Sequence, residues 1–480
     1  EIWRGPNEKW NQRGVREGDW VRLRYMADGM YALPDPRDPN LIYYNGHFGD
    51  ITRIDMANAD ERYIQPYPPG PNGGGAELEE YRFHWNSPIH ISPSDPDVVY
   101  YGGNVVFKTT DRGESWEIIS PDLTTDDPEK QKLSGGPISP DNTRAEFHCT
   151  ILSISESPLN PEVIWAGTDD GNLQITRDGG RSWSNVAPSI QGAPASSWFA
   201  SVQASPFNAG TAYVAIDQHR LNDFEPHAFV THDFGESWTE IGQGLEGYVH
   251  IVMEDPRQPN LLYAGTELGI FASFDRGASW TDLRLGIPPV AVRDMKVHPR
   301  DNDLVLGTHS RGFYILDDLT PLQHLAAARE SGGAMLFPPM SAVRYIPASD
   351  VSVIGDGVWV APNQPYGVLI SYWVPDETQE AGESPEGAGA PANIEILDAD
   401  GRVLRTMTGP ARPGINRTVW NLAEVSACQA PESQAGGPGS GRPGGRFGGG
   451  DRGTWVRAIP GEYVIRVRVG GETLEAMARV

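Results

Sequence analysis

An eight-residue pattern that occurs four times constrains the fold of this chain more than any other feature. Its copies occupy residues 109–116, 176–183, 231–238 and 273–280, and each reads S/T-x-D-x-G-x-S-W. The Gly permits a positive φ, the Asp and hydroxyl side chains can accept hydrogen bonds from a tight turn, and the Trp offers a large ring for burial. Because a motif present in every repeat builds the fold, we assign these residues a structural role. They are Asp111, Gly113, Trp116, Asp178, Gly180, Trp183, Asp233, Gly235, Trp238, Asp275, Gly277 and Trp280.

A second repeat lies about half a repeating unit upstream of the first. It is a Pro-containing turn followed by an apolar strand, and its six copies lie 43 to 65 residues apart, at Pro36, Pro93, Pro158, Pro206, Pro256 and Pro299. A period of this size with four short strands per unit indicates the blades of a β-propeller. Six blades are visible, residues 18–26 could supply a closing strand, and sequence before residue 1 could supply a seventh blade.

The eight-residue motif resembles the Asp-box, or BNR repeat, of sialidase-type β-propellers. The Asp-box joins the third and fourth strands of a blade, and the Pro turn joins the first and second, so both lie on one face. The turns between second and third strands, and the crossovers between blades, lie on the opposite face, called the top face below. We expect the four Asp-box Trp rings to be buried between blades, far from the central channel.

The C-terminal part of the sequence follows a different pattern. Residues 319–334 predict a helical linker, and residues 335–480 predict an immunoglobulin-like β-sandwich after the propeller of residues 1–318. Two low-complexity insertions interrupt the sandwich, an acidic one at 375–391 and a Gly-rich one at 436–453. The second insertion carries Arg442, Arg446 and Arg452, which we expect to bind carboxylates or backbone carbonyls of a partner chain or of the propeller. The fold class is therefore all-β.

Charge and cysteine content exclude several classes of function. The formal net charge of −26 argues against a nucleic-acid or anionic-membrane surface, because both need clustered Lys and Arg. No stretch of sequence is long and apolar enough to span a membrane. The two cysteines, Cys149 and Cys428, form no CxxC pattern, and the scattered His and carboxylates lack metal-ligand spacing. We expect no metal and no cofactor.

The chain also resembles a known group of proteins over nearly its whole length. The resemblance rests on residues 81–88, 119–123, 156–158, 165–171, 263–269 and 308–318, and on 416–420 and 460–463 in the sandwich. These segments are similar to bacterial "glycosyl hydrolase, BNR repeat" proteins, which have sortilin-type and xyloglucanase-type propellers and a closing immunoglobulin-like module. Such proteins are usually longer and exported, so the resemblance implies a C-terminal half and an extracytoplasmic location. The label describes fold, and fold alone does not give function.

Candidate site residues gather where the predicted blades meet the top face. As binding residues we select His84, Trp85, His148, Trp198 and Arg311, together with the three Arg of the Gly-rich insertion. The carboxylates that could serve in catalysis are Asp169, Asp170, Glu267 and Glu146. Two carboxylates across a sugar cleft would suffice for glycoside hydrolysis. The structural alternative is that Asp169, Asp170 and Glu267 occupy solvated hairpin turns, which turn chemistry explains fully.

Two functions follow from this pattern. The first is a non-catalytic, exported binding or scaffolding subunit that uses the propeller and the immunoglobulin-like module to contact other proteins. The second is a polysaccharide-active glycoside hydrolase of xyloglucanase type. We expect the first, because no specific catalytic motif is present and because the low-complexity insertions suit partner contacts. An open groove lined by Trp on the top face would favour the second.

Overall fold

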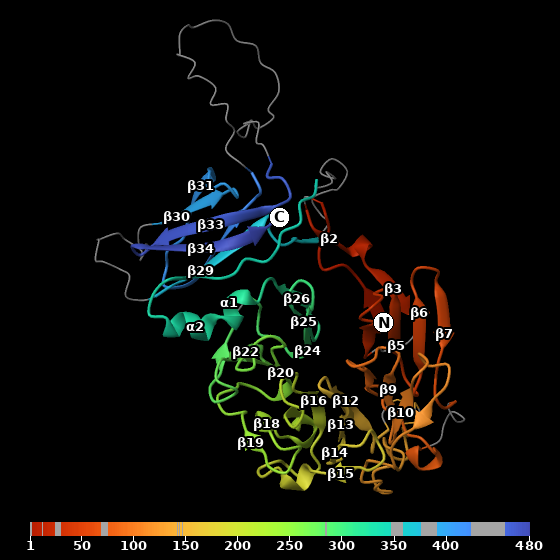
Figure 1. Ribbon diagram of the computed structural model, residues 1–480. Helices are drawn as coiled ribbons and strands as arrows, with labels where there is room; N and C mark the ends of the chain where they lie inside the picture. Colours follow the sequence, from red (N-terminus) through yellow and green to blue (C-terminus); the bar gives the residue numbers. More distant parts are fainter. Residues whose placement is uncertain are drawn as a thin grey trace, which may run out of the picture. The chain divides into compact units, whose positions relative to one another are not determined.

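The computed structural model describes residues 2–11, 13–24, 30–68, 75–141, 143, 145, 147–283, 286–346, 359–375, 391–423 and 457–480. Glu146, Cys428, Arg442, Arg446 and Arg452 lie outside the described residues, as does nearly all of both insertions. The chain forms two compact units (Figure 1). The first contains Glu1–Gly5 and Gly18–Asp317, and the second contains Pro6–Glu17 and Asp318–Val480.

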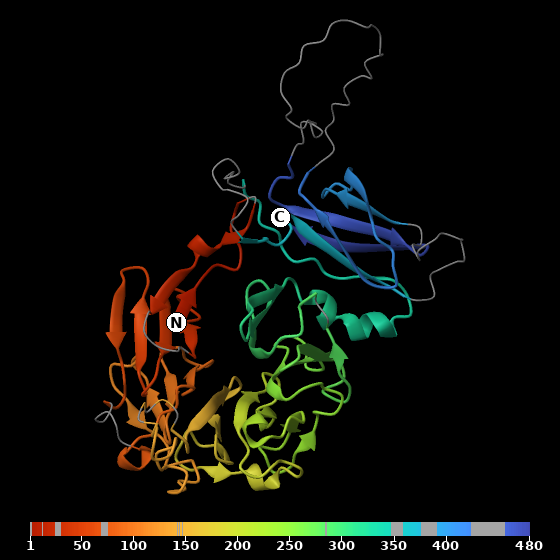
Figure 2. The same ribbon diagram turned by 180° about the vertical axis from the view of Figure 1, so that it is seen from behind.

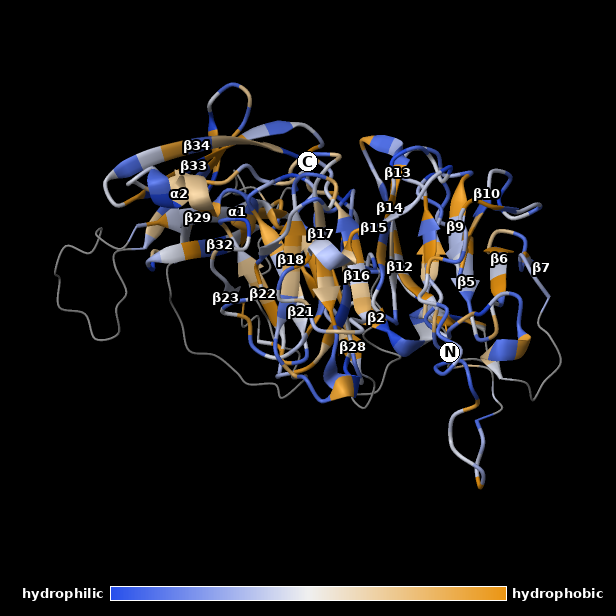
Figure 3. Cartoon of the chain, turned by 90° about the horizontal axis from the view of Figure 1, so that it is seen from below, coloured by the Kyte–Doolittle hydropathy of each residue, from blue (hydrophilic) through white to orange (hydrophobic). Residues whose placement is uncertain are grey.

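The first unit is a β-propeller. Within the described residues it has five four-stranded antiparallel sheets and one three-stranded sheet, each built from consecutive strands. Figure 2 shows these blades following one another in chain order, from red through yellow to green. The middle strands of the blades carry continuous buried apolar runs, whereas the loops are mostly hydrophilic (Figure 3).

The first three blades are β4 (Ala32–Pro34), β5 (Leu41–Asn45), β6 (Ile51–Asp55) and β7 (Asp60–Tyr63); β8 (Ile89–Ile91), β9 (Val99–Gly102), β10 (Val106–Thr109) and β11 (Glu117–Ile118); and β12 (Ile151–Ser157), β13 (Asn160–Thr168), β14 (Leu173–Thr176) and β15 (Ser184–Asn185). The last three are β16 (Phe199–Ala204), β17 (Ala212–Ile216), β18 (His227–Thr231) and β19 (Thr239–Glu240); β20 (Val249–Glu254), β21 (Leu262–Thr266), β22 (Ile270–Ser273) and β23 (Thr281–Asp282); and β24 (Val292–Val297), β25 (Leu304–Thr308) and β26 (Gly312–Leu316). Short 3-10 helices are η1 (Glu17–Asp19), η2 (Ala76–Leu78), η3 (Ala187–Ser189) and η4 (His219–Leu221).

The segment predicted to close the circle behaves differently from a closing strand. Its β3 (Val21–Arg24) pairs with β1 (Ile2–Arg4) in a separate two-stranded sheet. The segment meets the last blade through side chains instead, since the Trp20 ring stacks on Phe313 of β26 at 5.6 Å between centroids and 7° between planes. Ring stacking therefore joins the first and last parts of this unit, and residues 18–24 do not supply the closing strand that the sequence allowed.

The four Asp-boxes form the predicted turns with one hydrogen-bond pattern. In the last copy the Gly277 amide donates to Ser273 Oγ at 2.7 Å, and the Ser279 amide and hydroxyl donate to the Asp275 carboxylate at 2.8 and 2.6 Å. The other copies repeat these bonds. The prediction of a side-chain-stabilised turn is confirmed.

The Asp-box Gly residues serve a second purpose, the contact between blades. Their φ values are +91°, +99°, +87° and +91°. A Cβ at each of them would also lie only 2.5 to 2.9 Å from a residue that follows the outermost strand of the preceding blade. The pairs are Gly113 with Ile64, Gly180 with Ile119, Gly235 with Val186, and Gly277 with Ile241. Backbone conformation and close approach both require glycine here.

The Asp-box Trp rings meet the same residues but are less buried than predicted. Trp116, Trp183 and Trp280 donate their indole N–H to the carbonyls of Ile64, Ile119 and Ile241 at 2.6, 2.9 and 2.6 Å. Trp238 instead donates within its own turn, to the Gly235 carbonyl at 3.2 Å. The expected acceptor, the Val186 carbonyl, already accepts the Ser189 amide in η3.

All four Trp rings pack against the hydrophobic clusters of the blades and are half-buried. The rings are less buried than predicted because, in the four blades that carry an Asp-box, the outermost strand is only two residues long and both of its residues are exposed. Such a short strand leaves the outer edge of each ring at the surface.

The second unit is a β-sandwich of two antiparallel sheets. One contains β27 (Met335–Leu336), β29 (Val368–Val374) and β32 (Gly414–Trp420), and the other contains β31 (Val403–Gly409), β30 (Ala392–Leu397), β33 (Glu462–Val469) and β34 (Glu472–Arg479). Side chains from both sheets share one buried core that includes Ile370, Tyr372, Ile394, Trp420 and Ile465. Also in this unit, β2 (Val15–Arg16) pairs with β28 (Val360–Ala361).

The predicted helical linker is two short helices. They are α1 (Thr320–Gln323) and α2 (Leu325–Glu330), separated at His324. Pro321 occupies the first turn of α1, where its missing N–H costs no hydrogen bond.

Candidate active site

Titratable and charged side chains gather where the strands of blades four, five and six reach the top face. The first strand of a blade begins at this face and the second strand ends there. Asp217 therefore follows β17, Glu267 follows β21, His250 is the second residue of β20, and Arg293 is the second residue of β24. Four residues from distant parts of the sequence meet in this way.

His250 and Arg293 each contact two carboxylates. His250 Nε2 lies 3.1 Å from Glu267 Oε2, and His250 Nδ1 lies 3.5 Å from Asp217 Oδ2. Arg293 Nη2 lies 3.5 Å from the same Glu267 oxygen, and Arg293 Nη1 lies 3.8 Å from the same Asp217 oxygen. Asp217 also binds Nδ1 of His219 in η4. The two carboxylates are thus held on either side of one imidazole ring.

Exposure separates the roles that these groups can take. The Glu267 side chain is 35% exposed, whereas that of Asp217 is 5% exposed. Glu267 can therefore touch a bound molecule directly, and Asp217 can act only through its neighbours. His219, at 25% exposed, is the neighbour of Asp217 that reaches the surface.

Both carboxylates favour the ionised form. Burial alone would raise the pKa of Asp217, but hydrogen bonds from His250 and His219 outweigh it and lower the pKa to about 2. Burial would likewise raise the pKa of Glu267, but hydrogen bonds from Tyr248 and His250 and the charge of Arg293 lower it. Burial and the bond to Glu267 raise the pKa of Tyr248 to about 12. At neutral pH the two carboxylates are therefore proton acceptors, and Tyr248 keeps its proton.

An apolar rim borders the charged cluster. Leu221, Phe224 and Leu268 are 58%, 57% and 49% exposed. The Tyr248 ring stacks on His219 at 4.8 Å and lies 6.1 Å from the Phe224 ring. Exposed apolar groups beside fixed charges are the usual composition of a ligand-binding surface.

The aromatic residues selected from the sequence form one row on the top face. Trp85 lies 6.1 Å from His84, His84 lies 6.1 Å from Trp198, and Trp198 stacks on His148 at 6.0 Å. The guanidinium of Arg220, in η4, lies 4.4 Å above the Trp198 ring. Because Asp217 and His219 belong to the same turn as Arg220, the row continues into the charged cluster. Arg311 is exposed in the turn after β25 and takes part in none of these contacts.

Asp169 and Asp170 do not belong to a solvated turn or to a cleft. They are 0% and 2% exposed. Asp169 accepts hydrogen bonds from the amide and hydroxyl of Thr150 and lies 3.2 Å from His148 Nδ1. Asp170 accepts from the amide and hydroxyl of Thr125, which fastens the crossover between blades two and three. Neither carboxylate reaches a substrate, so their selection as catalytic candidates is corrected to a structural role.

Sequence reasoning selected Glu267 but not Asp217 or Tyr248. The signal that could have found them is their position in the repeat. Asp217 follows the second strand of its blade and Tyr248 precedes the first strand of its blade, so both lie at the top face. No local motif marks them. Among the described residues, no group of three or more His, Cys, Asp and Glu is placed to hold a metal ion.

Comparison with known proteins gives one weak sequence relative. No family model matches the chain. An oligoxyloglucan-reducing end-specific xyloglucanase of Emericella nidulans is 24% identical over 223 residues, which are 45% of this chain and 24% of the relative. The chain thus spans about a quarter of the length of that curated protein.

Solved structures give fold-level similarities only. The GH74 xyloglucanase from Xanthomonas campestris is 14% identical over 85% of this chain and 59% of its own, with a TM-score of 0.41. An ancestral GH74 enzyme is 16% identical over 71% of this chain and 39% of its own, with a TM-score of 0.34. The WD40 repeats of RRP9 are 9% identical over 62% and 78% of the two chains, with a TM-score of 0.41.

The sequence relative corrects our first expectation of function. A non-catalytic scaffolding subunit was expected because no catalytic motif stands out. The relative is a xyloglucanase, so the expectation of a scaffold was wrong. The comparisons give no support for partner proteins.

Proposed function

We propose that this chain is a glycoside hydrolase that acts on a xyloglucan-like polysaccharide. The observation that carries the proposal is the partly exposed Glu267, held by His250 and Arg293 on the top face and joined through His250 and the buried Asp217 to His219. Glycoside hydrolysis needs an ionised carboxylate and a proton donor on either side of the scissile bond. The 24% identity with a xyloglucanase supports the same reaction and suggests the substrate class.

Glu267 is the group assigned to water activation. It is ionised, partly exposed, and fixed by Tyr248, His250 and Arg293. A water molecule beside it loses a proton to the carboxylate as its oxygen attacks the anomeric carbon. The lowered pKa of Glu267 suits a proton acceptor better than a proton donor.

His219 is the group assigned to leaving-group protonation. Its Nδ1 is bound to the buried Asp217, so Nε2 is the nitrogen left for a substrate. In this role a proton passes from Nε2 of His219 to the glycosidic oxygen as the C–O bond breaks. Asp217 holds the ring by its Nδ1 and acts as a positioning residue. In the aromatic row, the half-buried Trp85 is the ring that can bind a neighbouring sugar by its apolar face, because His84 is 4% exposed and Arg220 lies over the Trp198 ring.

The test is hydrolysis of a panel of polysaccharides by the full chain, with product analysis. Xyloglucan and its oligosaccharides are the expected substrates. Glu267→Gln and His219→Gln should each lower the rate by about 10²- to 10⁴-fold, the usual contribution of a general base or acid. Glu246→Gln is the matched control, because Glu246 is an exposed carboxylate two residues before Tyr248. Full activity in the Glu267→Gln variant, or no hydrolysis of any glycan, would overturn the proposal.

An extracytoplasmic location is part of the same proposal, since an enzyme that hydrolyses a xyloglucan-like polysaccharide encounters this polymer outside the cytoplasm. In the part of the chain that the structure describes, no helix has the length and apolarity needed to cross a membrane.

A further inference from the structure

The β-sandwich unit presents an aromatic side chain on the outer face of one sheet. Along β29, Val368, Ile370, Tyr372 and Val374 point into the sandwich core. The alternating residues Leu369, Ser371 and Trp373 therefore occupy the outer face. Their partners across β32 are Val419, Arg417 and Ile415.

Other parts of the chain cover this outer face at Leu369 and Ser371 but leave Trp373 partly exposed. Leu369 and Ser371 are 4% and 3% exposed. Arg417 donates to Ser371 Oγ and to the Asp318 carbonyl, both at 3.0 Å, which ties the chain entering α1 to the sheet. The next pair along the strands is open, since Ile415 is 39% exposed and Trp373 is half-buried.

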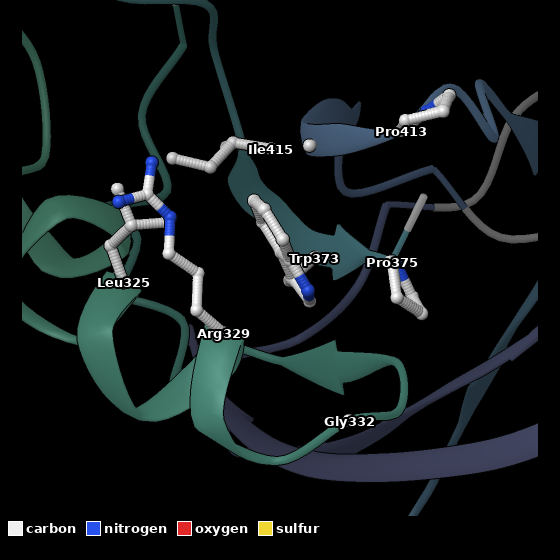
Figure 4. Close-up of a pocket in the computed structure, with 8 residues that line it drawn as sticks. Leu325, Arg329, Gly332, Trp373, Pro375, Pro413 and Ile415 are labelled. Atoms are coloured by element: carbon white, nitrogen blue, oxygen red, sulfur yellow. The ribbon is translucent and has the colours of Figure 1, made fainter. Parts of the chain in front are cut away.

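A pocket of about 780 Å³ lies over the uncovered pair. Trp373 and Ile415 form its apolar floor, Leu325 and Arg329 of α2 line one side, and Pro375 and Pro413 line the other. Figure 4 shows the Trp373 ring standing between the α2 side chains and the two prolines. The volume is within the range of small-molecule sites.

We propose that this pocket binds one or two pyranose rings of a neutral polysaccharide, stacked on Trp373. A pyranose has an apolar face that suits an indole and a rim of hydroxyls that suits hydrogen-bond donors such as a guanidinium. The pocket combines both features. The net charge of −26 repels polyanions at long range, which favours a neutral glycan over an acidic one.

This site goes beyond the proposed hydrolase and does not depend on which bond is cut. A second sugar site in the same chain raises apparent affinity for a polymer that reaches both sites, through effective concentration. A short oligosaccharide gains nothing from it. The sandwich is then the polymer-retaining part of the protein.

The test is affinity electrophoresis of the full chain in gels that contain soluble xyloglucan, with turnover of a short xyloglucan oligosaccharide measured in parallel. Trp373→Ala should lose at least about tenfold in affinity for the polymer, as a central aromatic contact does, and keep its turnover of the oligosaccharide. Trp373→Tyr keeps a ring and should retain most of the binding. Trp359→Ala is the matched control, because Trp359 belongs to the same unit, is 73% exposed and does not line the pocket.

Ile415→Glu is a second variant that tests the same pocket if Trp373→Ala misfolds. It changes the pocket floor at a partly exposed position, where a substitution disturbs the core less. It should weaken polymer binding without shifting the unfolding midpoint. Unchanged binding in Trp373→Ala and Ile415→Glu, equal loss in Trp359→Ala, or Trp373-dependent binding of polyproline in place of xyloglucan would overturn the proposal. Glu267→Gln should still be retarded, so failure of hydrolysis and failure of this site are distinguishable.

Discussion

Truncation of Trp280 tests the contact that the Asp-box makes between blades. A fully buried Trp covers roughly 150–250 Å², and Trp280 is half-buried. About 100 Å² of lost burial at 25 cal/mol per Å² amounts to about 2.5 kcal/mol. The lost hydrogen bond to the Ile241 carbonyl adds about 1 kcal/mol. Trp280→Ala should therefore lower the free energy of unfolding of the propeller by about 3–4 kcal/mol.

A Phe substitution isolates the indole N–H from the apolar area. Trp280→Phe should cost about 1 kcal/mol or slightly more, because the Ile241 carbonyl loses its donor. Trp238→Phe should cost less, because the Trp238 N–H donates only within its own turn, at 3.2 Å. Urea unfolding of the full chain, followed by circular dichroism, measures both. Equal losses in the two Phe variants would show that the bond to the preceding blade contributes nothing.

Three further predictions concern glycine, acid and a buried carboxylate. Gly277→Ala should destabilise the propeller by roughly 1–3 kcal/mol more than Gly244→Ala in thermal unfolding, since both have φ near +90° but only Gly277 approaches a neighbour, at 2.9 Å; equal losses would count against the role of close approach. Hydrogen bonds from Arg37 to Asp97 and from Ser182 to Asp178 lower the pKa values of both carboxyl groups to about 2 in the folded protein. The free energy of unfolding should therefore fall as pH drops from 3.8 to about 2, and the Asp97→Asn variant should show a weaker dependence. An unchanged acid profile in that variant would refute the assignment. Asp170→Ala should cost about 3 kcal/mol and speed hydrogen exchange over residues 124–131, since Asp170 binds the amide and hydroxyl of Thr125; normal protection there would contradict its structural role.

The architecture was predictable because its signals are local and repeated. Each Asp-box specifies its own turn through residues within eight positions, as the bonds from Ser279 to Asp275 show. The burial of the Trp rings was not predictable from the same motif. It depends on how long the outermost strand is, and β23 has only two residues, both exposed.

The candidate site was predictable only in part because its contacts are non-local. Asp169 and Asp170 read as loop carboxylates in sequence, but Asp170 is buried by a crossover some 45 positions away. Asp217 joins the cluster through His250, 33 positions later in the chain. Spacing alone does not reveal which blade ends face each other, and this decides which carboxylate is reachable.

The most direct test of the proposed hydrolase is kcat/KM on a xyloglucan oligosaccharide for the unmodified chain and the Glu267→Gln variant, each with its unfolding midpoint checked. The account predicts measurable hydrolysis by the unmodified chain and a loss of about 10²-fold or more in the folded variant. Equal kcat/KM values for the two proteins would contradict it.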